Sequence, residues 1–258
     1  MKKPIGIFDS GIGGLSILNS LVEKLPNESF IYLSDNKNCP YGNKSQEEIT
    51  NFSLKNSKKL IELNCKMIIV ACNTATTNCI NLLREKIPVP IIGIEPGIRP
   101  AILNTKTKNI GVLATEKTLE SKLFNSTSKD NIKDGIKVHE QIGYRLVNEI
   151  EKGIYGNILI ENYLKKYLSP MIKNNIDYLV LGCTHYNFLE EKINKILSKN
   201  VKIVDTISPV ANHVIKTLKS LKIENKKRSN YSIDIIYNGN KLSKEFMKTN
   251  YRISYLDF

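Results

Sequence analysis

Short apolar runs alternate with longer amphipathic segments along most of this chain. Residues 45–63 and 157–173 carry apolar positions at helical spacing, and Ser45 with Glu48 forms a capping-box pattern. The other apolar runs have strand length and are almost continuously hydrophobic, which is typical of parallel strands covered on both faces. They are residues 5–8, 30–33, 67–71, 91–94, 110–114, 178–182 and 202–204. This alternation predicts an α/β fold with mainly parallel sheets.

A weak internal repetition indicates two similar units. MIIVACNT at 67–74 and YLVLGCTH at 178–185 each run from an apolar stretch into a cysteine and polar residues. The segment EPGIRP at 95–100 has two prolines around a glycine, which favours a break in the chain there. We therefore predict two similar doubly wound α/β domains that face each other across an active-site cleft. The first comprises residues 1–97 plus 208–258 and the second residues 98–207.

The net charge of +13 raises the possibility of nucleic-acid binding. Only five of the 38 basic residues are arginine, and the lysines are spread along the chain. Nucleic-acid modules concentrate basic residues on one face, often with aromatic side chains for stacking. We expect no nucleic acid as the main partner, and a polyanion-binding protein remains the alternative from another class. Such a protein would show salt-sensitive binding that does not depend on particular cysteines.

Apolar content and cysteine usage indicate in which cellular compartment the protein is expected. No stretch approaches the roughly 18–20 apolar residues of a membrane span, so no membrane association is expected. Asp9 and a glycine cluster interrupt the amino-terminal segment before a signal-peptide apolar region could form. Five cysteines are an odd number with no disulfide-scaffold density. We expect a cytoplasmic protein with free thiols.

Cys72 and Cys183 both follow predicted strands, and each is followed by polar residues, Asn73–Thr74 and Thr184–His185. Ligands of open parallel sheets bind at the carboxyl ends of the strands. A thiol at such a position, near a helix N-terminus or a charged partner, can become a reactive thiolate. A buried structural cysteine is the alternative for either residue alone, and we keep it for Cys39, Cys65 and Cys79. The matched pair predicts one thiol for each face of a substrate.

Three further segments could complete such a cleft. The glycine-rich DSGIGG at 9–14 follows a strand and precedes a helix, where backbone N–H groups can face an anion, although a plain capped turn also explains it. CPYG at 39–42 could offer backbone donors from Tyr41 and Gly42, although the segment taken alone is better explained as a plain surface turn. Glu95 ends a predicted strand and either reaches the cleft or is a solvated loop carboxylate.

A zinc site is not expected from the sequence pattern. No pair of cysteines has the C-x-x-C spacing, and His139 and His213 lie far from Cys72 and Cys183 in the sequence.

These motifs together resemble the cofactor-independent glutamate racemases, within the aspartate/glutamate racemase family. The resemblance covers nearly the whole chain. It is carried by DSGIGGLS at 9–16, PYG at 40–42, ACNTA at 71–75, IEPG at 94–97, GVLAT at 111–115 and LGCTHY at 181–186. It implies racemisation of L-glutamate to D-glutamate for peptidoglycan synthesis, without a cofactor or metal. It also implies two α/β domains around the substrate and a homodimer.

The resemblance also implies residue roles. Cys72 would take the α-proton of D-glutamate and Cys183 that of L-glutamate. Asp9 and Glu95 would support Cys72, and His185 would support Cys183. The remaining residues implied to bind the substrate are Ser10, Tyr41, Gly42, Asn73, Thr74 and Thr184, with Thr115 and Thr118 as further candidates.

Two departures from the family pattern stand out. Asn187 replaces a frequent proline, and HEQIGYRLVNEIE at 139–151 lacks the expected Ala-Cys-Pro sequence, which leaves the packing of the second domain open. The nearest alternative activity is a racemase for aspartate or another acid on the same two-cysteine scaffold. A related decarboxylase would be expected to lack one of the two cysteines.

Overall fold

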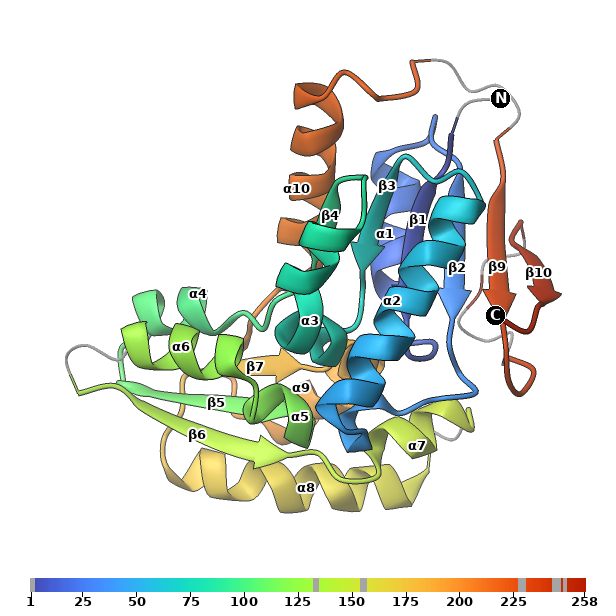
Figure 1. Ribbon diagram of the computed structural model, residues 1–258. Helices are drawn as coiled ribbons and strands as arrows, with labels where there is room; N and C mark the ends of the chain where they lie inside the picture. Colours follow the sequence, from blue (N-terminus) through green and yellow to red (C-terminus); the bar gives the residue numbers. More distant parts are fainter. Residues whose placement is uncertain (1–2, 132–134, 154–156, 227–230, 243–246, 248–249) are drawn as a thin grey trace.

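The computed structural model describes residues 3–131, 135–153, 157–226, 231–242, 247 and 250–258. Within these residues the chain forms two parallel sheets, each flanked by helices (Figure 1). The predicted α/β architecture is confirmed. No helix of the described ranges is long and apolar enough to cross a membrane.

The first sheet has six strands in the order β10-β9-β2-β1-β3-β4. Their bounds are β1 (Ile5–Asp9), β2 (Phe30–Ser34), β3 (Met67–Val70), β4 (Ile91–Gly93), β9 (Ile233–Tyr237) and β10 (Arg252–Tyr255). Ile5 and Ile7 face a core shared with α1 (Leu15–Lys24) and α10 (Ile207–Ser220). Phe8 faces the opposite core, with α2 (Gln46–Glu62) and α3 (Asn73–Lys86). Burial on both faces explains why these strands are almost continuously apolar.

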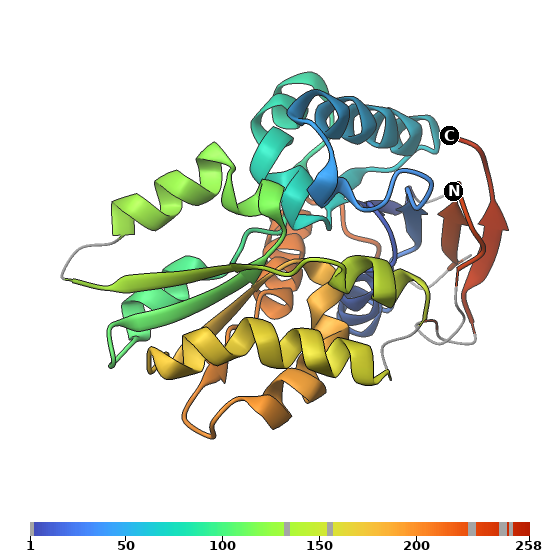
Figure 2. The ribbon, with the colours of Figure 1, turned by 90° about the horizontal axis from the view of Figure 1, so that it is seen from below.

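The second sheet has four strands in the order β6-β5-β7-β8. They are β5 (Asn109–Ala114), β6 (Lys137–Ile142), β7 (Tyr178–Gly182) and β8 (Lys202–Ile203). One face packs on α4 (Ile98–Asn104) and α6 (Lys122–Asn131). The other packs on α8 (Ile158–Lys173), which runs along the sheet, and on α9 (Glu190–Ile196) (Figure 2). The shorter helical segments are η1 (Tyr41–Asn43), α5 (Glu116–Leu119), α7 (Leu146–Glu151) and η2 (Thr184–Leu189).

Local signals set the helix starts. Ser45 caps α2: its Oγ accepts from the Glu48 N–H at 3.2 Å, while the Glu48 carboxylate accepts from the Ser45 N–H at 2.8 Å. This is the predicted capping box, and it satisfies two donors that the helix itself cannot. Asn157 caps α8 in a similar way through the Leu159 N–H.

The carboxyl-terminal part of the chain returns to the first sheet, because β9 pairs with β2. This pairing supports our division of the chain, although the boundaries at residues 97/98 and 207/208 remain a proposal. The divergent segment at 139–151 forms most of β6, which pairs with β5, and then α7. Leu146, Val147 and Ile150 of α7 are buried, so this segment packs closely without the expected Ala-Cys-Pro sequence.

Candidate active site

Both sheets reverse their strand order at the point where the chemically interesting residues lie. In the first sheet β1 and β3 are neighbours, Asp9 ends β1 and Cys72 follows β3. In the second sheet β5 and β7 are neighbours, Thr115 follows β5 and Cys183 follows β7. A ligand of such a sheet binds in the crevice outside the carboxyl ends of these strands. Two crevices of this kind face each other here.

One small cavity lies between the two crevices. About 10 Å³ of it is open to the centre of a water molecule. Its walls come from both halves of the molecule, and they include both thiols that the sequence analysis paired. The lining residues are Ser10, Pro40, Tyr41, Gly42, Cys72, Asn73, Thr74, Thr115, Val147, Cys183, Thr184 and His185.

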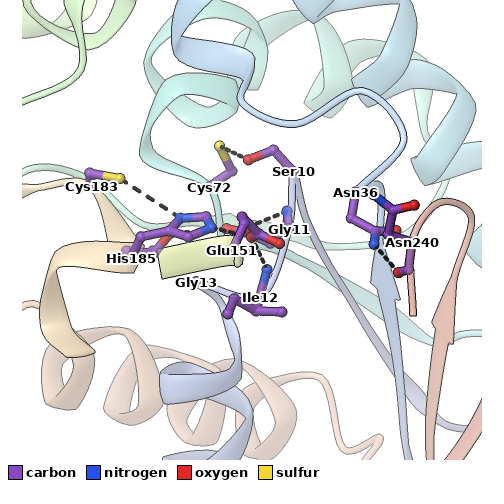
Figure 3. A network of polar contacts seen from close by, with 12 residues as sticks. Ser10, Gly11, Ile12, Gly13, Asn36, Cys72, Glu151, Cys183, His185 and Asn240 are labelled. Carbon is purple, nitrogen blue, oxygen red and sulfur yellow. Dashed lines mark hydrogen bonds and ion pairs between the residues drawn. The ribbon is translucent and has the colours of Figure 1, made fainter. Parts of the chain in front are cut away.

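Cys72 lies at the N-terminus of α3 and is buried. Its thiol faces the Ser10 hydroxyl at 3.8 Å (Figure 3). Burial and the Asp9 carboxylate raise the pKa of the Cys72 thiol well above its usual range, while the Ala75 amide and the Ser10 hydroxyl act in the opposite direction. Without a substrate the Cys72 thiol therefore keeps its proton. A positive charge nearby is needed to stabilise the thiolate before Cys72 can act as a base.

Cys183 is the first member of a chain of polar contacts. Its Sγ lies 3.9 Å from His185 Nδ1, and His185 Nε2 lies 2.6 Å from Glu151 Oε1 (Figure 3). Burial alone would lower the pKa of His185, but its hydrogen bonds to Cys183, Cys39 and Glu151 raise that pKa well above the usual range. The imidazole can thus hold a proton beside the Cys183 sulfur while Glu151 fixes its orientation.

The glycine-rich turn after β1 receives the Glu151 carboxylate, because the Ile12 N–H donates to Glu151 Oε1 at 2.8 Å. The anion that faces this turn is thus a side chain of the second half. The close approach of Glu151 and His185 also explains why glycine occupies positions 11 and 13. A Cβ at Gly11 would lie 1.9 Å from Glu151 Oε1, and one at Gly13 would lie 2.4 Å from His185 Nδ1.

Asp9 is buried and joins the two halves. Its Oδ1 accepts from the Gly11 N–H at 2.8 Å and its Oδ2 accepts from the Thr184 hydroxyl at 3.0 Å. Burial raises the pKa of Asp9 to about 6, although His185 and both hydrogen bonds act against the rise. Asp9 can therefore titrate close to neutral pH and change the charge next to Cys72.

The remaining polar side chains in the cavity wall belong to Asn73, Thr74 and Thr115, and Thr118 lies beside the two threonines. Asn73 is buried, and neither its carboxamide oxygen nor its nitrogen has a partner among the described residues. Buried amides without partners are rare, and this one is available to a ligand. The hydroxyls of Thr74, Thr115 and Thr118 lie 2.9–3.2 Å from one another, so they connect α3 of the first half to the β5–α5 turn of the second.

Comparison with known proteins identifies this arrangement. Residues 5–214 match the model of the Asp/Glu/Hydantoin racemase family. The chain belongs to this family. It is 44% identical to the glutamate racemase of Ralstonia pickettii over 223 residues, which cover 86% of this chain and 79% of that protein.

Solved structures of the family have the same fold. A glutamate racemase isoform from Bacillus anthracis superposes with a TM-score of 0.88 at 31% identity, covering 99% of this chain and 97% of that one. The glutamate racemase of Francisella tularensis, solved in complex with D-glutamate, gives 0.86 at 32% identity with the same coverage.

Tyr41 lines the cavity, while its hydroxyl donates to the Asp35 carboxylate and accepts from the Asn56 amide at 3.0 Å. Glu95 is exposed and lines a separate pocket of about 500 Å³ with Arg84 and His213. The structure does not bring Glu95 to the cavity, because it follows β4, an edge strand away from the β1–β3 crevice.

Sequence reasoning missed Glu151, because nothing local marks it. Its contact with Ile12 joins residues 139 positions apart. It also missed a group of possible metal ligands: Cys39, Glu151 and His185 offer ligand atoms that all lie within 4.8 Å of one another. The three come from separate segments, so no spacing rule could reveal them.

Proposed function

We propose that this protein interconverts L- and D-glutamate without a cofactor, using Cys72 and Cys183 as the two bases. One observation carries the proposal: two thiols, each at the switch point of its own parallel sheet, line one cavity. Racemisation needs a group on each side of the α-carbon, one to remove the proton and one to return a proton. The similar proteins are glutamate racemases, which supports the choice of substrate.

In the proposed reaction, Cys183 removes the α-proton of L-glutamate while Cys72 protonates the opposite face. The reverse reaction exchanges these roles, so each turnover leaves the proton on the other thiol. His185 serves as the proton partner of Cys183, and Asp9 sets the charge beside Cys72. The substrate ammonium group brings positive charge into the buried site, which favours a thiolate there.

The carbanion needs stabilisation that pyridoxal phosphate supplies in other racemases. We assign this to donors converging on the α-carboxylate, in particular the unpaired Asn73 amide and the hydroxyls of Ser10, Thr74 and Thr184. Fixed donors in a site that excludes water stabilise developing charge more strongly than water does. The Thr115 and Thr118 hydroxyls and the backbone of Tyr41 and Gly42 complete the proposed binding site.

The cellular part of the proposal is D-glutamate supply for peptidoglycan in the cytoplasm, by a homodimer. The resemblance to glutamate racemases supports it. Light scattering of the purified protein tests the dimer, and D-glutamate auxotrophy after depletion of the protein tests the pathway.

The reaction is tested by incubating the protein with L- or D-glutamate in deuterated water, with no added cofactor. We expect loss of optical rotation from both enantiomers and α-deuterium in the product. Cys72→Ser and Cys183→Ser should each abolish racemisation yet leave deuterium exchange into a single enantiomer. Cys79→Ser is the matched control, because a serine hydroxyl can keep the 2.9 Å bond to the Ala75 carbonyl.

Three outcomes would contradict the proposal. Turnover of aspartate in place of glutamate would remove the substrate assignment but keep the chemistry. Racemisation by either single-cysteine variant at the wild-type rate would remove the two-thiol mechanism. Folded, reduced protein that is inert towards all acidic amino acids would remove the function.

A further inference from the structure

Cys39 has no part in the proposed reaction, yet it lies against two residues beside the cavity. It precedes η1, while Glu151 ends α7 and His185 lies in η2. The sulfur, one carboxylate oxygen and one ring nitrogen lie within 4.8 Å of one another. His185 is buried, and the Cys39 and Glu151 side chains are partly exposed.

The three donor atoms are those that Zn²⁺ prefers. Zinc binds thiolate sulfur at about 2.3 Å and imidazole or carboxylate atoms at about 2.0–2.2 Å, often with three protein ligands and one open position. Tetrahedral geometry with these bond lengths places the ligand atoms about 3.3–3.6 Å apart. All three ligand atoms lie within 4.8 Å of one another, so the partly exposed Cys39 side chain must approach by no more than about 1 Å, which it can do by rotation. Glu151 Oε1 and His185 Nε2, now 2.6 Å apart, must move apart by less than about 1 Å.

Charge also favours a divalent cation at this cluster. A coordinated thiol loses its proton, so Cys39 and Glu151 together would supply two negative charges to one dication. The His185 ring would bind as neutral imidazole. Glu151 already accepts a hydrogen bond from the Ile12 N–H, which holds one ligand in place before the ion arrives.

We propose that Cys39, Glu151 and His185 form an inhibitory Zn²⁺ site. An ion bound there withdraws His185 from proton transfer and replaces its hydrogen bond to Glu151. The binding part of this inference stands on the cluster alone. The inhibition part rests on the proposed role of His185 in racemisation.

The competing zinc site is the cavity itself, where Cys72 and Cys183 offer two thiols. The two sites differ in which cysteine provides the metal–sulfur bond. Co²⁺ reports this directly, because it substitutes for zinc and its bond to a thiolate gives a charge-transfer absorption band that does not depend on enzyme activity.

The first experiment titrates Co²⁺ into the reduced full-length protein and into three variants, each checked for folding by circular dichroism. We expect the thiolate band in the wild type and in the Cys72→Ser/Cys183→Ser double variant, its loss in Cys39→Ser, and its displacement by Zn²⁺. Cys79→Ser is the control and should keep the band. A band that persists in Cys39→Ser, that disappears in the double variant, or that is absent from the wild type overturns the site.

The second experiment measures racemisation at increasing free Zn²⁺. Half-inhibition of Cys39→Ser, relative to its own activity without metal, should need at least tenfold more zinc than the wild type, and a chelator should restore the wild-type rate. Equal sensitivity of the two proteins overturns the inhibition. A wild type that binds Co²⁺ as expected but racemises nothing would refute the proposed function and leave the metal site standing.

Discussion

Replacing Glu151 with glutamine removes a carboxylate that holds two elements of the site together. Its Oε1 accepts from the Ile12 N–H at 2.8 Å and lies 2.6 Å from His185 Nε2, and its side chain is only 18% exposed. A glutamine oxygen can keep the first bond but not the charge-assisted second one. Hydrogen bonds to charged groups contribute about 1.5–3 kcal/mol, so we expect kcat/KM to fall about 10- to 150-fold.

The pH dependence distinguishes this loss from general damage, because Glu151 is one of the partners that raise the pKa of His185. Its neutralisation lowers that pKa, and the limb of the pH–rate profile that belongs to His185 must move to lower pH. The fall in kcat/KM must be equal in both directions for any variant, since the enantiomers have equal free energy, and this equality serves as an internal check of the assay.

The assay follows optical rotation from each enantiomer between pH 5 and pH 9, with thermal unfolding measured in parallel. Glu149→Gln is the matched control: it lies on the same helix, and its carboxylate pairs with the exposed Lys152 at 3.1 Å. Activity of Glu151→Gln within twofold of the wild type would refute the reasoning. So would an unshifted pH profile, or an equal loss in Glu149→Gln.

Three further predictions follow from other contacts. Gly11→Ala should reproduce the activity loss of Glu151→Gln, because the new Cβ would lie 1.9 Å from Glu151 Oε1; wild-type kinetics in this variant would exclude the close approach. Burial raises the pKa of Asp9 from its ordinary value of 3.8 to about 6, so between these values the folded state binds more protons than the unfolded state. Stability should therefore fall by roughly 3 kcal/mol as pH rises from about 4 to about 6. Asp9→Asn should lose this part of the pH dependence in urea unfolding, and an unchanged dependence would contradict the buried carboxyl. Arg145 lines a pocket that shares Pro40, Gly42, Thr115 and Val147 with the cavity, so Arg145→Ala should raise KM for glutamate severalfold at constant kcat, whereas Arg252→Ala should change neither; equal effects would indicate overall charge alone.

Seven of the strands could be predicted from their apolar runs, whereas β6, β9 and β10 could not. Asp234 interrupts the apolar run of β9. β6 and β10 lie at sheet edges and carry exposed side chains, among them Lys137 and Arg252. An edge strand with one solvated side carries charged residues and loses the continuous apolar signal.

The site residues also include some that could be predicted from the sequence and some that could not. Cys72 and Cys183 could be found because strand ends are visible in the sequence and the chemistry of a thiol is distinctive. Glu151 could not be predicted, because its role depends on how closely the two halves of the molecule approach each other. The only trace of this approach in the sequence is the pair of glycines at positions 11 and 13. Glu95 shows the opposite error: it follows a strand as Cys72 does, but the sheet order that separates a central strand from an edge strand is not readable from one strand alone.

The small cavity has a consequence for the kinetics of the proposed reaction. A space of about 10 Å³ holds roughly one water molecule, and glutamate is several times larger. The cavity walls, which come from both halves, must therefore move apart to admit each substrate molecule and again to release each product molecule. Exchange of ligand with solvent is thus gated by the protein, so turnover should slow as solvent viscosity rises even where proton transfer itself is fast.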